Sequence, residues 1–183
     1  MIYDKEAIMR REARFFLYPL VVVFAIGLLG PYTAHAADLK TGTVSAGGAI
    51  GFLANTPDGT AFALNLNADY FVHPNVSVGP LFQLAATGDL SQIGFSGQGK
   101  FWIDLPGTEH KARLTLQGGI GFVHSDLFES DTSWLIPIGI GLDYTLNQQL
   151  SFMATFLLNF TDLDTGGGTG AHVMPGLTFG VRF

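Results

Sequence analysis

The chain has 183 residues, of which 48% are hydrophobic and only 13% charged, with 24 Gly, 16 Phe and no Cys. So low a charge content does not suit an ordinary water-exposed surface, where about a quarter of the residues are charged. The absence of Cys excludes disulfide scaffolds and Cys-based zinc sites, and the net charge of -6 argues against nucleic acid as a partner.

The first 36 residues have the pattern of a cleavable signal peptide. Three arginines precede the apolar run Phe15–Leu29, and the small-residue triplet Ala34–Ala36 follows it. The run of 15 residues is shorter than the roughly 20 that a transmembrane helix needs. We therefore predict export with cleavage after Ala36, translation starting at Met1 or Met9, a signal peptide over residues 1–36 and a mature domain over residues 37–183.

After residue 37 the chain shows short segments of alternating polarity separated by Gly, Pro, Asn, Asp and Thr, which indicates strands joined by turns. Eight strands are predicted: Thr43–Ala54, Ala61–Val72, Val76–Thr87, Ile93–Asp104, Ala112–Val123, Trp134–Thr145, Leu150–Thr161 and Ala171–Phe183. Tight turns at His73–Asn75 and Leu146–Gln149 alternate with longer polar segments such as His124–Ser133. The pattern predicts an all-β, eight-stranded antiparallel up-and-down barrel with tight turns at one end and longer loops at the other.

Sorting each predicted strand by alternate positions gives two unlike faces. One set of 48 residues contains no charged side chain, whereas the other contains six charged residues and ten glycines. A soluble barrel would turn the apolar set inward and expose the polar set to water. Six charges are about half the density expected of a soluble surface, and glycines suit a narrow lumen. We therefore predict a transmembrane barrel whose apolar face contacts lipid.

Aromatic residues on the apolar face fall near both ends of the strands, as in the aromatic girdles of membrane barrels. One predicted ring contains Phe52, Phe62, Phe95, Phe122, Trp134 and Phe160, and the other contains Tyr70, Phe101, Tyr144, Phe152 and Phe183. The two rings mark two membrane interfaces.

Three segments carry a resemblance to a known family: Gln117–Phe122, Gly139–Phe152 and the last strand, which ends in an aromatic residue. The chain resembles the small eight-stranded outer-membrane barrels grouped around opacity proteins, outer membrane protein X and the barrel of outer membrane protein A. The resemblance implies that Phe183 is part of the signal read by the outer-membrane assembly machinery. It also implies a Gram-negative outer-membrane location after export through the periplasm, with membrane lipid and lipopolysaccharide as surroundings, and we expect a monomer.

The lumen-facing charges all lie in the half of the barrel that carries the chain termini. They are Asp69, Lys100, Asp104, Arg113, Asp143 and Arg182, three acids and three bases. Unpaired ions in a narrow interior are costly, so we expect a hydrogen-bonded network that plugs the lumen. A proton or ion path through the same residues is the alternative.

The other half of the lumen is predicted to be lined by small or apolar residues. Leu53, Leu135, Leu157 and Met174, with His172 as a polar group, define a possible pocket for a small apolar ligand. The alternative is that these side chains simply pack together.

The connections predicted at this end carry seven acids and no Lys or Arg. These acids could form a solvated rim, or they could bind divalent cations beside lipopolysaccharide. No metal or cofactor site can be assigned from the spacing. We predict no enzyme, because no nucleophile and base fall at a suitable spacing. The sequence thus favours a non-enzymatic outer-membrane barrel with a structural or surface-interaction role, and the alternative is a carrier or narrow conduit for small apolar molecules.

Overall fold

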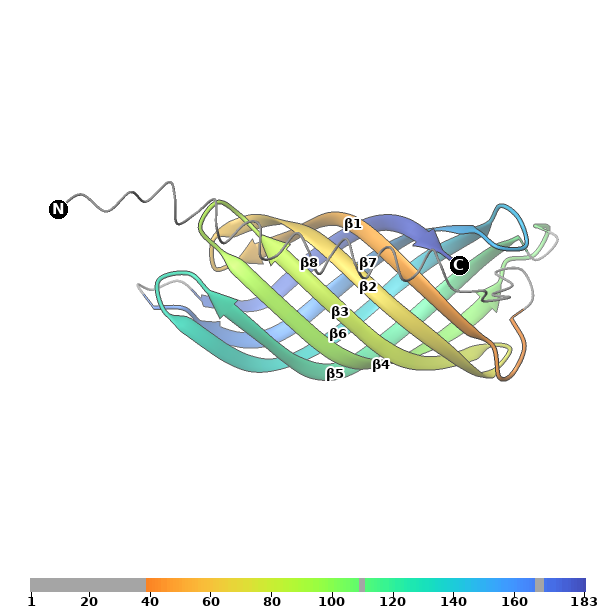
Figure 1. Cartoon of the computed structure of the whole chain (residues 1–183), viewed down its shortest axis with the longest axis horizontal. Helices are drawn as coiled ribbons and strands as arrows, with labels where there is room; N and C mark the ends of the chain where they lie inside the picture. The colour runs from red at the N-terminus through yellow and green to blue at the C-terminus, as the bar shows by residue number, and fades with distance from the viewer. Residues whose placement is uncertain (1–38, 109–110, 167–169) are drawn as a thin grey trace. The chain divides into compact units, whose positions relative to one another are not determined.

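The computed structural model describes residues 39–108, 111–166 and 170–183, so the predicted signal peptide lies outside the described residues. The strands are β1 (Val44–Thr56), β2 (Gly59–His73), β3 (Val76–Ala86), β4 (Ser91–Asp104), β5 (Ala112–Asp126), β6 (Ser130–Thr145), β7 (Ser151–Asp164) and β8 (Gly170–Arg182). Each strand pairs antiparallel with its neighbours in sequence, and β1 pairs with β8 to close the barrel (Figure 1). The structure confirms the predicted eight-stranded up-and-down barrel.

No helix among the described residues is long and apolar enough to cross a membrane.

Alternating polarity along each strand produces the two faces of the wall, as β4 illustrates. Lys100 and Trp102 are buried inside the barrel, whereas Phe95 and Phe101 on the outer face are about half exposed. The same pattern repeats around the barrel, so large apolar side chains cover the outside and polar ones fill much of the inside.

Strand pairing brings the predicted aromatic residues together at two levels of the wall. Phe122 pairs with Phe95 on one side and with Trp134 on the other, and the Phe95 and Phe122 ring centroids are 6.0 Å apart. At the opposite level, Tyr144 pairs with Phe152. Aromatic side chains therefore lie on the exterior near both ends of the barrel.

We call the end with the β1–β2, β3–β4, β5–β6 and β7–β8 connections the outer end, and the end with the two chain termini of the barrel the inner end. The long loop predicted over His124–Ser133 is wrong, because β5 and β6 remain paired up to Asp126 and Ser130 and only Leu127–Glu129 connect them. The prediction ended each strand where the apolar residues of its outer face give way to polar ones. Backbone pairing between β5 and β6 continues beyond that point.

Pairing between β1 and β8 closes the barrel along most of the length of these two strands. The register runs from Gly47 opposite Arg182 to Leu53 opposite Gly176. The backbones of Ala46 and Phe183 then exchange two hydrogen bonds, of 3.2 and 2.8 Å. The chain end is therefore part of the closing seam.

The narrow barrel depends on close approach of neighbouring strands at Gly121. A Cβ atom there would overlap the carbonyl oxygen of Phe95 and lie 2.5 Å from the Cα atom of Ser96. Only glycine fits this inward position without displacing β4.

Candidate functional site

The lumen is the candidate site, and its inner half contains a buried charge network. Arg182 of β8 forms a two-bond ion pair with Asp143 of β6, with Nη2 to Oδ1 at 2.8 Å and Nε to Oδ2 at 2.9 Å. Lys100 of β4 pairs with Asp69 of β2 at 2.9 Å between Nζ and Oδ2. All four side chains are at most 9% exposed, so each charge is compensated within the protein.

Trp102 of β4 joins these two ion pairs. The Arg182 guanidinium lies over its ring, 5.2 Å from the centroid, and the indole Nε1 donates a 2.9 Å hydrogen bond to Ser77 Oγ. Ser77 in turn donates to Asp69 at 3.4 Å. The resulting network crosses the lumen from β2 to β8.

Two further polar side chains contact the buried ions. Asn67 donates a 2.7 Å hydrogen bond to Asp69 Oδ2, and Arg182 Nη2 donates to Ser151 Oγ at 3.2 Å. The network thereby includes residues of β2, β3, β4, β6, β7 and β8. Each of the four buried charges in this layer has a partner of opposite sign.

A third ion pair, Arg113 with Asp104, forms at the inner rim. The two residues are opposite each other on β5 and β4, and Arg113 Nε contacts Asp104 Oδ1. Asp104 is 37% exposed, so this pair is partly solvated. The structure thus places the six predicted lumen charges in three ion pairs, two of them deeply buried.

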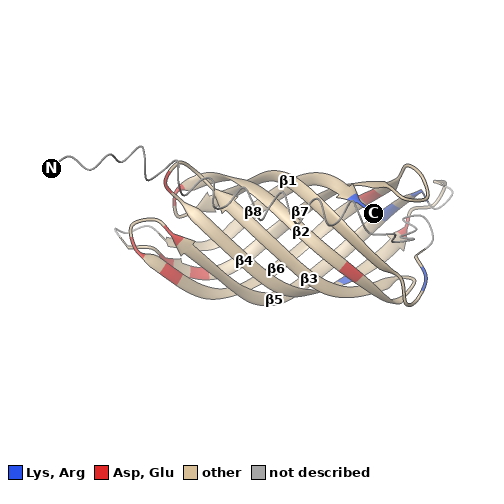
Figure 2. Cartoon of the chain, viewed as in Figure 1, with Lys and Arg blue, Asp and Glu red and all other residues tan. Residues whose placement is uncertain are grey.

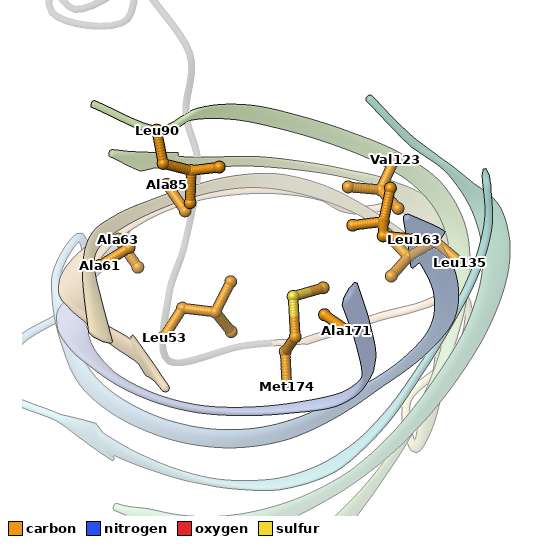
Figure 3. Packing of buried hydrophobic residues seen from close by; sticks show 10 residues of the cluster. All are labelled: Leu53, Ala61, Ala63, Ala85, Leu90, Val123, Leu135, Leu163, Ala171 and Met174. Atoms are coloured by element: carbon orange, nitrogen blue, oxygen red, sulfur yellow. The ribbon is translucent and has the colours of Figure 1, made fainter. Parts of the chain in front are cut away.

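An apolar layer fills the outer end of the lumen. Its members are Leu53, Ala61, Ala63, Ala85, Leu90, Val123, Leu135, Leu163, Ala171 and Met174, with Leu127 packed against them. Figure 3 shows these side chains coming from opposite walls and converging on the interior. We call this set the outer apolar layer.

The predicted pocket residues Leu53, Leu135, Leu157 and Met174 line one small cavity with a volume of about 20 Å³. That volume has room for about one water molecule, whereas ligand pockets measure about 300 to 1,000 Å³. Packing of the side chains therefore describes this region better than an apolar ligand pocket.

His172, predicted to line the pocket, lies outside it. Its side chain is 77% exposed, and its Nδ1 lies 3.1 Å from Asp162 Oδ1 on the outer surface. The reason is a register shift between β7 and β8 at Phe160–Leu163, which breaks the alternation so that Ala171 and Met174 face inward while His172 does not.

Seven acidic residues on strand ends and connections lie near the outer end of the barrel, whereas the described Lys and Arg residues lie in its inner half (Figure 2). The acids are Asp58, Asp89, Asp126, Glu129, Asp131, Asp162 and Asp164. Several contact the protein itself: Asp58 accepts a hydrogen bond from Thr87, and Asp131 Oδ2 accepts the Asp164 amide at 2.8 Å. Within the described residues, no group of three or more His, Asp or Glu side chains is arranged to hold a metal ion.

The two histidines near the outer end make simple surface pairs. His124 Nδ1 lies 2.8 Å from Thr132 Oγ1, and both are exposed. Ser125, the next residue in the chain, is fully buried on the opposite face and does not share a surface with His124.

A second apolar cluster, Leu39 with Phe71 and Trp102, lies at the inner end and was not predicted. We call it the inner aromatic cluster. The inward register of Phe71 and Trp102 was the available signal, because alternation places both on the lumen side. No periodic signal pointed to Leu39, which precedes the first strand.

No protein-family model and no curated protein sequence matches the chain. Solved structures with a similar fold include two small barrels. Neisserial surface protein A has 18% identity and a TM-score of 0.54, and the match covers 76% of this chain and 94% of that one. The N-terminal barrel of Pseudomonas aeruginosa OprF has 16% identity and a TM-score of 0.51, with 79% and 98% covered.

The fold is that of the small eight-stranded outer-membrane barrels. Identities this low establish the fold and leave the role to be argued from the lumen and the surface.

Proposed function

We propose that the chain is a non-enzymatic outer-membrane barrel with a closed lumen, whose role is structural or depends on interactions at the cell surface. The observation that carries this proposal is the combination of an apolar exterior with buried side chains at three levels of the interior. These levels are the inner aromatic cluster, the buried ion pairs and the outer apolar layer. Closure of the barrel leaves no unpaired strand edge to face lipid.

Membrane insertion is supported by the exterior and is tested with the two tryptophans of the chain. Trp134 is on the outside and 48% exposed, whereas Trp102 is 3% exposed inside the barrel. In bilayers with brominated acyl chains, we expect quenching of the Trp102→Phe variant, which retains Trp134, and little quenching of the Trp134→Phe variant. Equal quenching of both would contradict the proposed orientation, as would a folded protein that stays monodisperse without detergent.

A closed lumen predicts the absence of steady conductance. We expect planar bilayers containing the purified protein to show no single-channel steps, and proteoliposomes to remain impermeable to small sugars. The paired, buried ions and a cavity of about 20 Å³ support this expectation. Regular conductance steps would instead favour the conduit, the alternative role.

The proposed orientation directs the outer end away from the cell. An even number of strands keeps both chain ends on one side, and a chain that is exported first into the periplasm retains its ends there. The acidic outer end then faces lipopolysaccharide and the surroundings, and Phe183 on the closing seam contacts the assembly machinery during insertion. Neisserial surface protein A is, by its name, a surface protein, which agrees with a surface role.

We assign no catalytic step to this barrel and propose that it acts as a monomer. The two exposed histidine pairs, His124 with Thr132 and His172 with Asp162, are the surface contacts nearest to an acid–base arrangement. Incubation of the purified protein with lipopolysaccharide, followed by mass spectrometry of the lipid A, is expected to show unchanged acylation. Release or transfer of an acyl chain would refute the assignment.

A further inference from the structure

The segment before β1 turns back into the inner mouth of the barrel. Thr43 N donates a 3.0 Å hydrogen bond to Lys40 O, which closes a four-residue turn with Gly42 at its third position. Gly42 has a φ of 90°, a conformation that this turn requires and that side-chain-bearing residues rarely adopt. The turn reverses the chain just after Leu39.

Backbone hydrogen bonds attach this segment to β2. Gly42 N donates to Phe71 O at 2.8 Å, and Phe71 N donates to Thr43 O at 2.9 Å. These bonds extend the β1–β2 ladder beyond Val44, the first residue of β1. These hydrogen bonds hold the turn at the inner rim of the barrel, so that Leu39, which precedes the turn, lies over the opening of the lumen.

Leu39 is only 4% exposed, although it precedes the first strand. It packs with Phe71 and Trp102, whose ring centroids are 5.4 Å apart at an interplanar angle of 45°. Leucine side chains in a polar segment outside the strands are normally solvated, so nearly complete burial indicates a specific seat.

The seat of Leu39 lies directly beside the buried ions. Trp102, a member of the same cluster as Leu39, has the Arg182 guanidinium 5.2 Å from its ring centroid. Lys100, two residues earlier on β4, pairs with Asp69 deeper in the lumen. Removal of Leu39 would therefore admit water to the layer where two ion pairs depend on exclusion from solvent.

We propose that residues 39–43 form an inner stopper, in which Leu39 is the apolar head and the Gly42 turn is the hinge. The stopper occupies an aromatic seat formed by Phe71 and Trp102 and separates the charge network from the periplasmic side. The inference rests on the proposed function only for the side of the membrane that the inner end faces.

Thiol labelling tests the seat of Leu39 directly, because the chain has no Cys of its own. A Leu39→Cys variant in folded barrels is treated with a charged maleimide and compared with Leu146→Cys. Leu146 is a leucine in the β6–β7 connection at the same end, and it is 47% exposed. We expect labelling at position 39 to be at least about tenfold slower, since thiol reactivity follows exposure. Equal rates in protein that retains heat-modifiable mobility would overturn the stopper.

Trp102 supplies a second measurement that does not require a thiol. In a Trp134→Phe background, Leu39→Ala is expected to raise acrylamide quenching of Trp102 at least about twofold, because local opening exposes the seat. Leu146→Ala in the same background is the matched control and is expected to leave quenching unchanged. A folded Leu39→Ala barrel with unchanged Trp102 quenching would contradict the proposal.

Failure of the stopper and failure of the closed lumen give different results. The charge network and the outer apolar layer remain in place when Leu39 is removed, so Leu39→Ala barrels are expected to stay non-conducting while Trp102 becomes accessible. Conductance of the unmodified barrel would refute the closed lumen, whatever the labelling rates are. Slow labelling of the Leu39→Cys variant in such a conducting barrel would still support the stopper.

Discussion

The two halves of the lumen are filled by different kinds of interaction. The outer half packs leucine, alanine and methionine side chains against one another, whereas the inner half places Asp69, Lys100, Asp143 and Arg182 out of contact with water. Apolar packing tolerates small changes at a cost set by the cavity that they leave, but a buried ion requires its partner. In the outer half of the lumen, the loss of stability on substitution should therefore scale with the volume removed. In the inner half, the loss should be large whenever one partner of an ion pair is removed.

The largest effect is expected at the buried ion pair. Asp143→Ala leaves the Arg182 guanidinium, 1% exposed, without its two-bond partner and should lower the free energy of unfolding by about 4 kcal/mol. Asp104→Ala, which disrupts the partly exposed pair at the inner rim, is the control and should cost at most about 1 kcal/mol. Urea unfolding in lipid or detergent, followed by heat-modifiable mobility, measures both.

A double variant distinguishes two causes of the lost stability: the unpaired charge of Arg182 and the loss of its attraction to Asp143. Asp143→Leu combined with Arg182→Met should recover most of the stability lost in Asp143→Ala, because removal of both charges leaves none uncompensated. A double variant as unstable as the single one would show that the pair itself stabilises the barrel.

A smaller effect is expected in the outer apolar layer. Leu135→Ala removes a side chain that is 1% exposed and should cost about 3 kcal/mol, the sum of lost transfer energy and the cavity that remains. Leu142→Ala, on the same strand but facing outward, is the matched control, since lipid can occupy the space it leaves. Equal losses of unfolding free energy at the two positions would mean that the outer apolar layer is loosely packed.

A further effect is expected where β4 and β5 approach each other closely at Gly121. Gly121→Ala places a methyl group against the backbone of β4 and should cost about 2 kcal/mol through displacement of that strand. Gly97→Ala, on the neighbouring strand, adds its methyl group to open space on the exterior and is expected to be tolerated. The same unfolding assay compares the two, and similar stability of both variants would exclude close strand approach at Gly121.

The smallest effect is expected outside the lumen, at His172. Its contact with Asp162 is solvent-exposed, so His172→Ala should change the free energy of unfolding by at most about 1 kcal/mol. A loss comparable to that of Leu135→Ala would instead place His172 among the packed lumen residues.

The sequence predicted the barrel and its two faces because alternation acts over the full length of every strand. The inward register of Lys100 and Asp143 was readable for the same reason. Which acid pairs with which base was not readable, since partners such as Asp143 and Arg182 are 39 residues apart and meet only after the wall curves and closes.

The misplaced and missed residues share a different cause. His172 sits at a register shift, where a two-residue period no longer reports orientation, and Leu39 reaches the lumen through a turn formed by Gly42. Leu90 lies in the β3–β4 connection, and Leu163 lies in β7 beyond the predicted end of that strand. Hydrophobic alternation does not encode turns, register shifts or the exact ends of strands.

In the proposed orientation, the extended pairing of β5 and β6 affects how antibodies would recognise the protein at the cell surface. Asp126 and Asp131 lie on a hydrogen-bonded ribbon with Phe128 exposed at its tip, so the pairing fixes the backbone positions of both residues. A linear peptide of residues 124–133 would sample many conformations that the native ribbon does not adopt. Antibodies raised against that peptide would therefore recognise the native barrel poorly. A cyclised peptide with the native register is the better immunogen for this epitope.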